Sequence, residues 1–103
     1  MSESIHIAEI VTFQLKAGSD PTAFVYAARA IEPMLRASED VVSRTLSRGE
    51  DGIWTDHIIW TSLAAATTAA NAMMSDPIAA PMMQMIDPEH VQMRHAPILY
   101  QQI

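Results

Sequence analysis

At 103 residues, half of them hydrophobic, the chain has room for one domain, and residues 1–103 are interpreted as a single unit. Its formal charge of −6 and its scattered Lys and Arg residues argue against nucleic-acid binding, which needs basic groups gathered on one face. Because the sequence contains no cysteine, it excludes disulfides, thiolate catalysis and cysteine metal sites.

The first part of the chain predicts a strand, a helix and a second strand. Apolar residues recur at every second position over residues 5–15, which is typical of a strand. Asp20 can cap a helix, and the proline after it suits the first helical position. They predict a helix over residues 21–32, followed by a short turn to Ser38. Residues 41–48 alternate as a partly exposed strand does.

A hairpin is predicted in the middle of the chain. Gly49 and Gly52 can adopt the positive φ angles of a tight turn between two strands. The second of these strands, residues 53–61, has the highest aromatic and β-branched content in the chain. One of its faces carries His57, and the other carries Trp54, Asp56, Ile58 and Trp60.

The last part of the chain predicts helices and a closing strand. Ser62 can cap an alanine-rich helix over residues 63–74, and Asp76 can cap a shorter helix that ends near residue 86. A strand over residues 90–100 completes the domain. No stretch reaches membrane-spanning length and no secretory signal pattern is present, so we expect a protein that does not enter a membrane. The lack of cysteine is typical of a reducing, cytoplasmic setting, which we therefore expect.

The order β-α-β-β-α-β predicts an α+β fold of the ferredoxin-like kind. Right-handed crossovers place the third strand between the first two and the fourth beside the first, which gives an antiparallel sheet of order 4-1-3-2. Both helices then lie on one face of this sheet. Because the other face stays uncovered, we expect a second copy of the chain to cover it, which makes the protein a homodimer.

The segment Trp54-Thr55-Asp56-His57-Ile58-Ile59-Trp60-Thr61-Ser62 and the alanine-rich helix after it resemble the dimeric α/β-barrel superfamily, in which a Trp-x-Ser step commonly leads into the second helix. The element order is similar to that of its antibiotic-biosynthesis-monooxygenase-like proteins over nearly the whole chain. The resemblance implies a monooxygenase that acts on an aromatic or polyketide-like molecule without a cofactor. The superfamily is functionally diverse, so a non-catalytic ligand-binding or stress-responsive barrel is the alternative.

Two branches of this superfamily can be compared residue by residue. The haem-degrading enzymes use an Asn on the first strand and a Trp and an axial His in the second helix. Here the first strand has no Asn, and residues 63–85 contain neither Trp nor His, so haem degradation is disfavoured. The cofactor-free oxygenases hold a phenolate with Asn, Arg, Tyr, Trp and His; the only tyrosines here are Tyr26 and Tyr100, so the match is incomplete.

Glu9 is the most informative residue, because it interrupts the apolar face of the first strand. A carboxylate there must find a partner or meet water in a cavity, where it can serve as a general base. His57 and His95 would flank Glu9 if their side chains lie on the same face of the sheet. The three residues could then relay a proton or, less favourably, bind a divalent metal. The alternative is a structural carboxylate that pairs with Arg44 or Arg94, or a hydrogen bond at the subunit interface.

Trp60, Met73, Met82 and Met85 are predicted to line a pocket for an apolar or aromatic ligand, since thioethers adapt to irregular apolar shapes. The alternative is that the tryptophan anchors the core or an interface and that the methionines fill space. No metal-ligand spacing and no glycine-rich phosphate loop occurs, so neither a metal nor a cofactor is predicted. The sequence leaves open which strand faces line the cavity, because one slip of register exchanges them.

Overall fold

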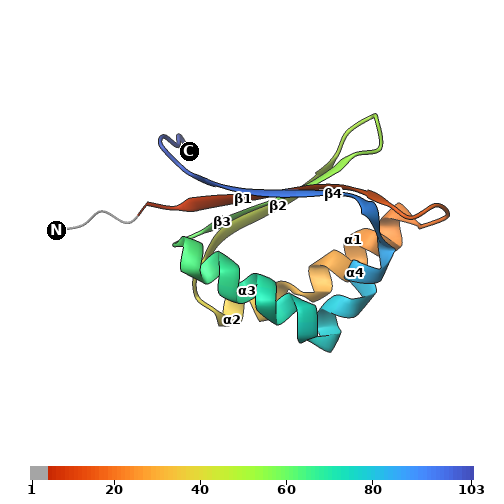
Figure 1. Ribbon diagram of the computed structural model, residues 1–103, viewed down its shortest axis with the longest axis horizontal. Coiled ribbons are helices and arrows are strands. Elements are labelled where there is room, and N and C mark those ends of the chain that lie inside the picture. Colours follow the sequence, from red (N-terminus) through yellow and green to blue (C-terminus); the bar gives the residue numbers. More distant parts are fainter. Residues whose placement is uncertain (1–4) are drawn as a thin grey trace.

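The computed structural model describes residues 5–103 and shows a four-stranded antiparallel sheet with the helices on one of its faces (Figure 1). In chain order the elements are β1 (Ile7–Leu15), α1 (Pro21–Ala30), α2 (Glu32–Ala37), β2 (Val41–Arg48), β3 (Trp54–Trp60), α3 (Leu63–Ser75), the 3₁₀ helix η1 (Pro77–Ala79), α4 (Ala80–Met85) and β4 (Ile86–Pro97). The strand order β2-β3-β1-β4 confirms the predicted topology. Within this part of the chain, no helix has the length and apolar character needed to cross a membrane.

The helical boundary after α1 differs from the prediction. The first helix ends at Ala30, and a second short helix, α2, occupies the place of the predicted turn. Pro33 lies in the first turn of α2, where its missing N–H costs no helical hydrogen bond. The proline therefore divides the helical region without ending it.

The last strand was predicted over residues 90–100 but runs from Ile86 to Pro97. Asp87 accepts a hydrogen bond from the Glu89 backbone N–H at 3.0 Å, and its second oxygen lies 2.9 Å from His90 Nδ1. These bonds, the backbone one first, lower the pKa of Asp87. Because β4 is an edge strand, it accommodates the proline that follows Asp87 and can begin before it.

The strand registers determine which side chains meet the helices. Glu9 of β1 pairs with Ile58 of β3 and with His95 of β4, and Phe13 pairs with Trp54. Directly opposed residues of antiparallel strands share a face. The face that carries Glu9 therefore also carries the two tryptophans of β3, and the core residues Phe13, Trp54, Ile58 and Trp60 place this face against the helices.

The core is centred on three aromatic rings beside α1. The ring centroids of Phe13 and Phe24 are 5.4 Å apart, and those of Phe24 and Trp54 are 4.9 Å apart. Phe24 is 1% exposed. Side chains from the helices and the sheet complete the buried cluster: Ala28, Ile31, Leu35, Ile58, Trp60, Ala66, Ala79 and Met82.

No helix of residues 5–103 covers the opposite face of the sheet (Figure 1). The registers place Ala8, Ile10 and Ile59 near the centre of this open face, beside His57. Exposed polar side chains surround this centre: Ser43, Thr45, Ser47, Gln92 and Arg94. The open face therefore has an apolar centre and a polar margin.

We expect Phe24→Ala to lower the free energy of unfolding by roughly 3–5 kcal/mol, since it removes a buried ring and leaves a cavity. Tyr26→Ala, on the same helix, is the control, because Tyr26 is 78% exposed and its loss should change stability by less than about 0.5 kcal/mol. Urea denaturation followed by circular dichroism measures both. Equal effects of the two substitutions would contradict this description of the core.

Candidate functional site

A cavity of about 430 Å³ lies between the sheet and the helical layer. Its floor comes from β1, β3 and β4, and α3 and α4 provide much of its roof. α3 begins beside the sheet and slopes away from it toward its C-terminal end (Figure 1). Five methionines line the cavity: Met73, Met74, Met82, Met83 and Met93. The space is thus largely apolar and bounded by adaptable thioether side chains.

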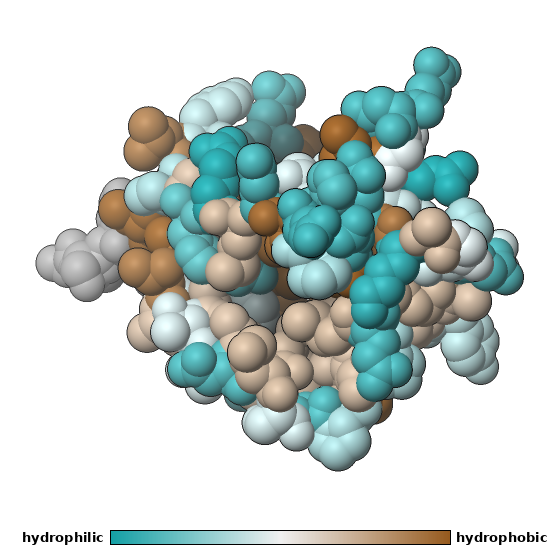
Figure 2. All heavy atoms as spheres, turned by 45° about the vertical axis from the view of Figure 1, so that its right-hand side comes forward, coloured by the Kyte–Doolittle hydropathy of each residue, from teal (hydrophilic) through white to brown (hydrophobic). Residues whose placement is uncertain are grey.

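The cavity opens to solvent between the end of α3, α4 and β4. Met74 at the end of α3 is 80% exposed, and Met93 on β4 is 54% exposed, although both line the cavity. Moderately hydrophobic side chains gather over the lower, helical part of the molecule in the view of Figure 2, below the polar side chains of the sheet. An apolar molecule can therefore reach the cavity past an apolar rim.

Glu9 and His95 face each other across β1 and β4 on the cavity side of the sheet. His95 Nε2 lies 2.9 Å from Glu9 Oε1, within hydrogen-bond distance. The Glu9 side chain is 10% exposed and that of His95 is 26% exposed. Glu9 lines the cavity, and His95, beside it on β4, does not. A carboxylate backed by an imidazole can accept a proton from a molecule in the cavity.

Arg44 and Asp56 form a second polar pair, on β2 and β3. Arg44 donates from Nε to Asp56 Oδ1 at 3.0 Å and from Nη2 to Oδ2 at 2.8 Å. Its Nη1 donates to the carbonyl of Ala28 in α1 at 2.7 Å. The two side chains are only 16% and 11% exposed, so this bidentate pair ties the hairpin to a helix beneath the surface.

Sequence reasoning missed this ion pair, because it considered Arg44 as a partner of Glu9. Both arginine partners considered for Glu9 are wrong, since Arg44 bonds Asp56 and Arg94 lies opposite Ile10 on the open face. Glu9 bonds His95 instead. The hairpin turn could have indicated the pair. Antiparallel pairing across it places Arg44 opposite Ile58, on the face that also carries Asp56.

The predicted placement of His57 beside Glu9 is wrong. His57 pairs with Ile10 on β1 and Thr45 on β2, so it lies on the open face, whereas Glu9 lies on the covered face. Side chains alternate along a strand, and an odd-numbered residue of β3 therefore points away from the cavity. Glu9, His57 and His95 cannot share a metal ion, and within residues 5–103 no other cluster of three such side chains is suited to one.

Three of the four predicted pocket residues, Trp60, Met73 and Met82, line the cavity. Met85 does not, and packs instead against the buried core at the junction of α4 and β4. Trp60 is 1% exposed, and its Nε1 has no hydrogen-bond partner in the described part of the chain. The sequence prediction missed two further lining residues, Asp56 and Met93.

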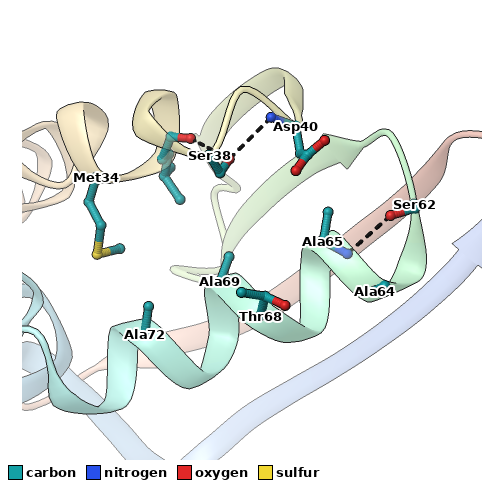
Figure 3. Close-up of a pocket in the computed structure, with 10 residues that line it drawn as sticks. Met34, Ser38, Asp40, Ser62, Ala64, Ala65, Thr68, Ala69 and Ala72 are labelled. Carbon is teal, nitrogen blue, oxygen red and sulfur yellow. Dashed lines mark hydrogen bonds between the residues drawn. The ribbon is translucent and has the colours of Figure 1, made fainter.

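A second hollow, of about 350 Å³, lies between α2 and α3. Met34 on α2 faces a row of small side chains on α3 (Figure 3), which includes Ala65, Ala69 and Ala72. The two serine hydroxyls that line this hollow are used locally: Ser38 Oγ donates to the Leu35 carbonyl, and the Ser62 hydroxyl accepts the Ala65 N–H. Neither Glu9 nor Asp56 lines this hollow, so we regard the methionine-lined cavity as the candidate site.

Comparison with known proteins shows which solved structures share this fold. No protein-family model matches the sequence, and no curated protein shows significant similarity to it. Solved structures do match: SnoaB, a cofactor-independent oxygenase from Streptomyces nogalater, is 16% identical over 96% of both chains, with a TM-score of 0.67. The predicted resemblance is thereby confirmed as a likeness of fold.

Two further structures agree. A provisionally assigned antibiotic biosynthesis monooxygenase from Nitrosomonas europaea is 12% identical, covers 97% of this chain and 96% of its own, and has a TM-score of 0.75. A conserved protein from Methanosarcina mazei Go1 is 12% identical over 90% of this chain and 92% of its own, with a TM-score of 0.72. At such low identities, similarity to antibiotic-biosynthesis-monooxygenase-like structures establishes the fold and leaves the activity open.

We expect Arg44→Met to destabilise the protein by roughly 3–5 kcal/mol, because it leaves the Asp56 carboxylate buried without its cation. Adding Asp56→Leu should restore much of that loss. Arg36→Met is the matched control: Arg36 pairs with Glu32 on the surface, where its side chain is 75% exposed, and such pairs contribute about 0.3–0.5 kcal/mol. Denaturant unfolding of the four proteins would contradict the assignment if both arginine substitutions had equal effects.

Proposed function

We propose that this chain binds an apolar or aromatic small molecule in the methionine-lined cavity, and that Glu9 and His95 act there as the proton acceptor of a cofactor-independent monooxygenase. The supporting observation is a carboxylate–imidazole pair at the floor of an otherwise mainly apolar space of about 430 Å³. Small-molecule sites commonly occupy about 300–1,000 Å³. The methionines line this space and do not fill it.

The proposed chemistry begins with a proton transfer. Glu9 accepts a proton from a phenolic hydroxyl or an acidic C–H of the bound molecule, and His95 holds the carboxylate in position. The resulting electron-rich ring gives its electrons to dioxygen and forms a carbon–oxygen bond. Overall, a ring CH₂ group and O₂ yield a ring carbonyl and water, so that the substrate supplies all the electrons. The similarity in fold to a cofactor-independent oxygenase supports this reaction class.

A non-catalytic ligand-binding barrel is the second candidate function. One observation favours it: Glu9 and His95 bond to each other, and a satisfied buried pair can serve the structure alone. Both candidates require a ligand in the cavity, but only the first consumes oxygen. Oxygen uptake therefore distinguishes the two candidate functions.

We expect Glu9→Gln to reduce oxygen uptake by about 100-fold or more with electron-rich hydroxynaphthalenes or anthrones, because the amide cannot accept the proton. Ligand affinity should change much less, since shape and apolar contacts persist. Glu89→Gln, at an exposed position of β4, is the control and should retain the wild-type rate. Uptake by Glu9→Gln at the wild-type rate contradicts the catalytic role, and binding without any uptake favours the non-catalytic barrel.

The proposal includes a second copy of the chain on the open face of the sheet. Ala8, Ile10 and Ile59 supply an apolar centre there, within a polar margin, which is the usual anatomy of a subunit interface. His57 Nε2 is buried on this face and has no partner among residues 5–103. A neighbouring chain can cover the apolar centre, where Ile10 is partly exposed in the single chain.

We expect Ile10→Glu to convert a dimer into a folded monomer, because it places a charge at the centre of the buried surface. Light scattering at micromolar concentration measures the mass, and circular dichroism checks the fold. Tyr26→Glu, on the exposed side of α1, is the control and should stay dimeric. A wild-type protein that is monomeric under these conditions contradicts the proposed assembly.

A further inference from the structure

We infer that the cavity selects a neutral or cationic ligand that carries a hydrogen-bond donor, and that it rejects anions. This inference rests on the proposed binding function and specifies its substrate class. The charged and polar atoms that line the cavity support it. The ionisable side chains that line it are both acidic, Glu9 and Asp56.

No lysine, arginine or histidine from residues 5–103 lines the cavity. The two basic side chains that bond these carboxylates are already engaged. Arg44 directs Nε and Nη2 at Asp56 and Nη1 at the Ala28 carbonyl, and Met82 Sδ lies 3.7 Å from its Nη2. His95 bonds Glu9 through Nε2. A ligand in the cavity therefore meets carboxylate oxygens and finds no free cation.

Glu9 has one oxygen available for a ligand. Oε1 bonds His95, whereas Oε2 has no hydrogen bond to any residue of the described chain and is not fully buried. An ionised carboxylate only accepts hydrogen bonds. A hydroxyl or an ammonium group of the ligand can donate to Oε2, but a carboxylate or phenolate offers no proton.

An anionic ligand also meets electrostatic repulsion. Its charge would approach the Glu9 carboxylate in an apolar space, where the interaction is screened less than in water, whereas the charge of Asp56 is balanced by Arg44. Juxtaposed like charges are a strong element of discrimination against a wrong partner. The cofactor-free oxygenases that this chain resembles are expected to hold a phenolate. Here the phenol enters in its neutral form, and its proton passes to Glu9 only after binding.

Three probes that differ in one substituent test this selectivity by isothermal titration calorimetry at neutral pH. They are 2-naphthol, which is a neutral donor, 2-naphthylmethylamine, which is a cationic donor, and 2-naphthoate, which is an anion. We expect the first two to bind at least about tenfold more tightly than naphthoate. In Glu9→Gln this difference should shrink to less than about threefold, because the charge is removed while the shape is kept.

Glu89→Gln is the matched control and should keep the wild-type ranking, since it removes a carboxylate that does not line the cavity. The ranking of the three probes on the wild-type protein decides the inference even if Glu9→Gln fails to fold. Naphthoate that binds as tightly as the other two overturns the inference and leaves the proposed binding function intact. If none of the three binds, the proposed binding function fails, and the inference with it.

Discussion

The architecture depends on one constraint: helices cover only one face of the sheet, so strand register assigns every strand residue to the covered face or to the open face. A slip of one residue in β1 would exchange Glu9 for its neighbours Ala8 and Ile10. The Arg44–Asp56 pair opposes a slip of the hairpin, because it joins β2 to β3 and also bonds the Ala28 carbonyl. Any other register would leave one of these charges buried without a partner.

The same constraint explains why a cavity exists. α3 carries alanines where it lies close to the sheet, and Ala66 there is fully buried. Toward its end α3 slopes away from the sheet (Figure 1). Met73 and Met74, near this end, line the cavity. Small side chains permit close approach at one end of the helix, and long flexible ones line the cavity at the other. The two acidic side chains, Glu9 and Asp56, lie on the floor of the cavity.

The sequence was sufficient for the topology, because element order and crossover handedness leave few sheets to choose from. It also indicated that His95 flanks Glu9, since β4 lies beside β1. His57 was misplaced because a pattern of alternation does not say which face meets the helices. The ion pair of Arg44 was missed because its guanidinium reaches Asp56 diagonally, and such reach depends on a rotamer. Met85 was misplaced because η1 and the short α4 interrupt the helical repeat from which its position was predicted.

The candidate site and the proposed interface lie on opposite sides of the same strands, one residue apart. Glu9 is flanked along β1 by Ala8 and Ile10, which belong to the open face. His95 is flanked in the same way on β4 by Arg94 and Ala96. A second chain packed on the open face would therefore hold the backbone beneath both members of the pair without touching their side chains. Side chains that transfer a proton need fixed relative positions. The proposed dimer would therefore have a role in the proposed chemistry, because it would support the geometry of the pair from the other side of the sheet.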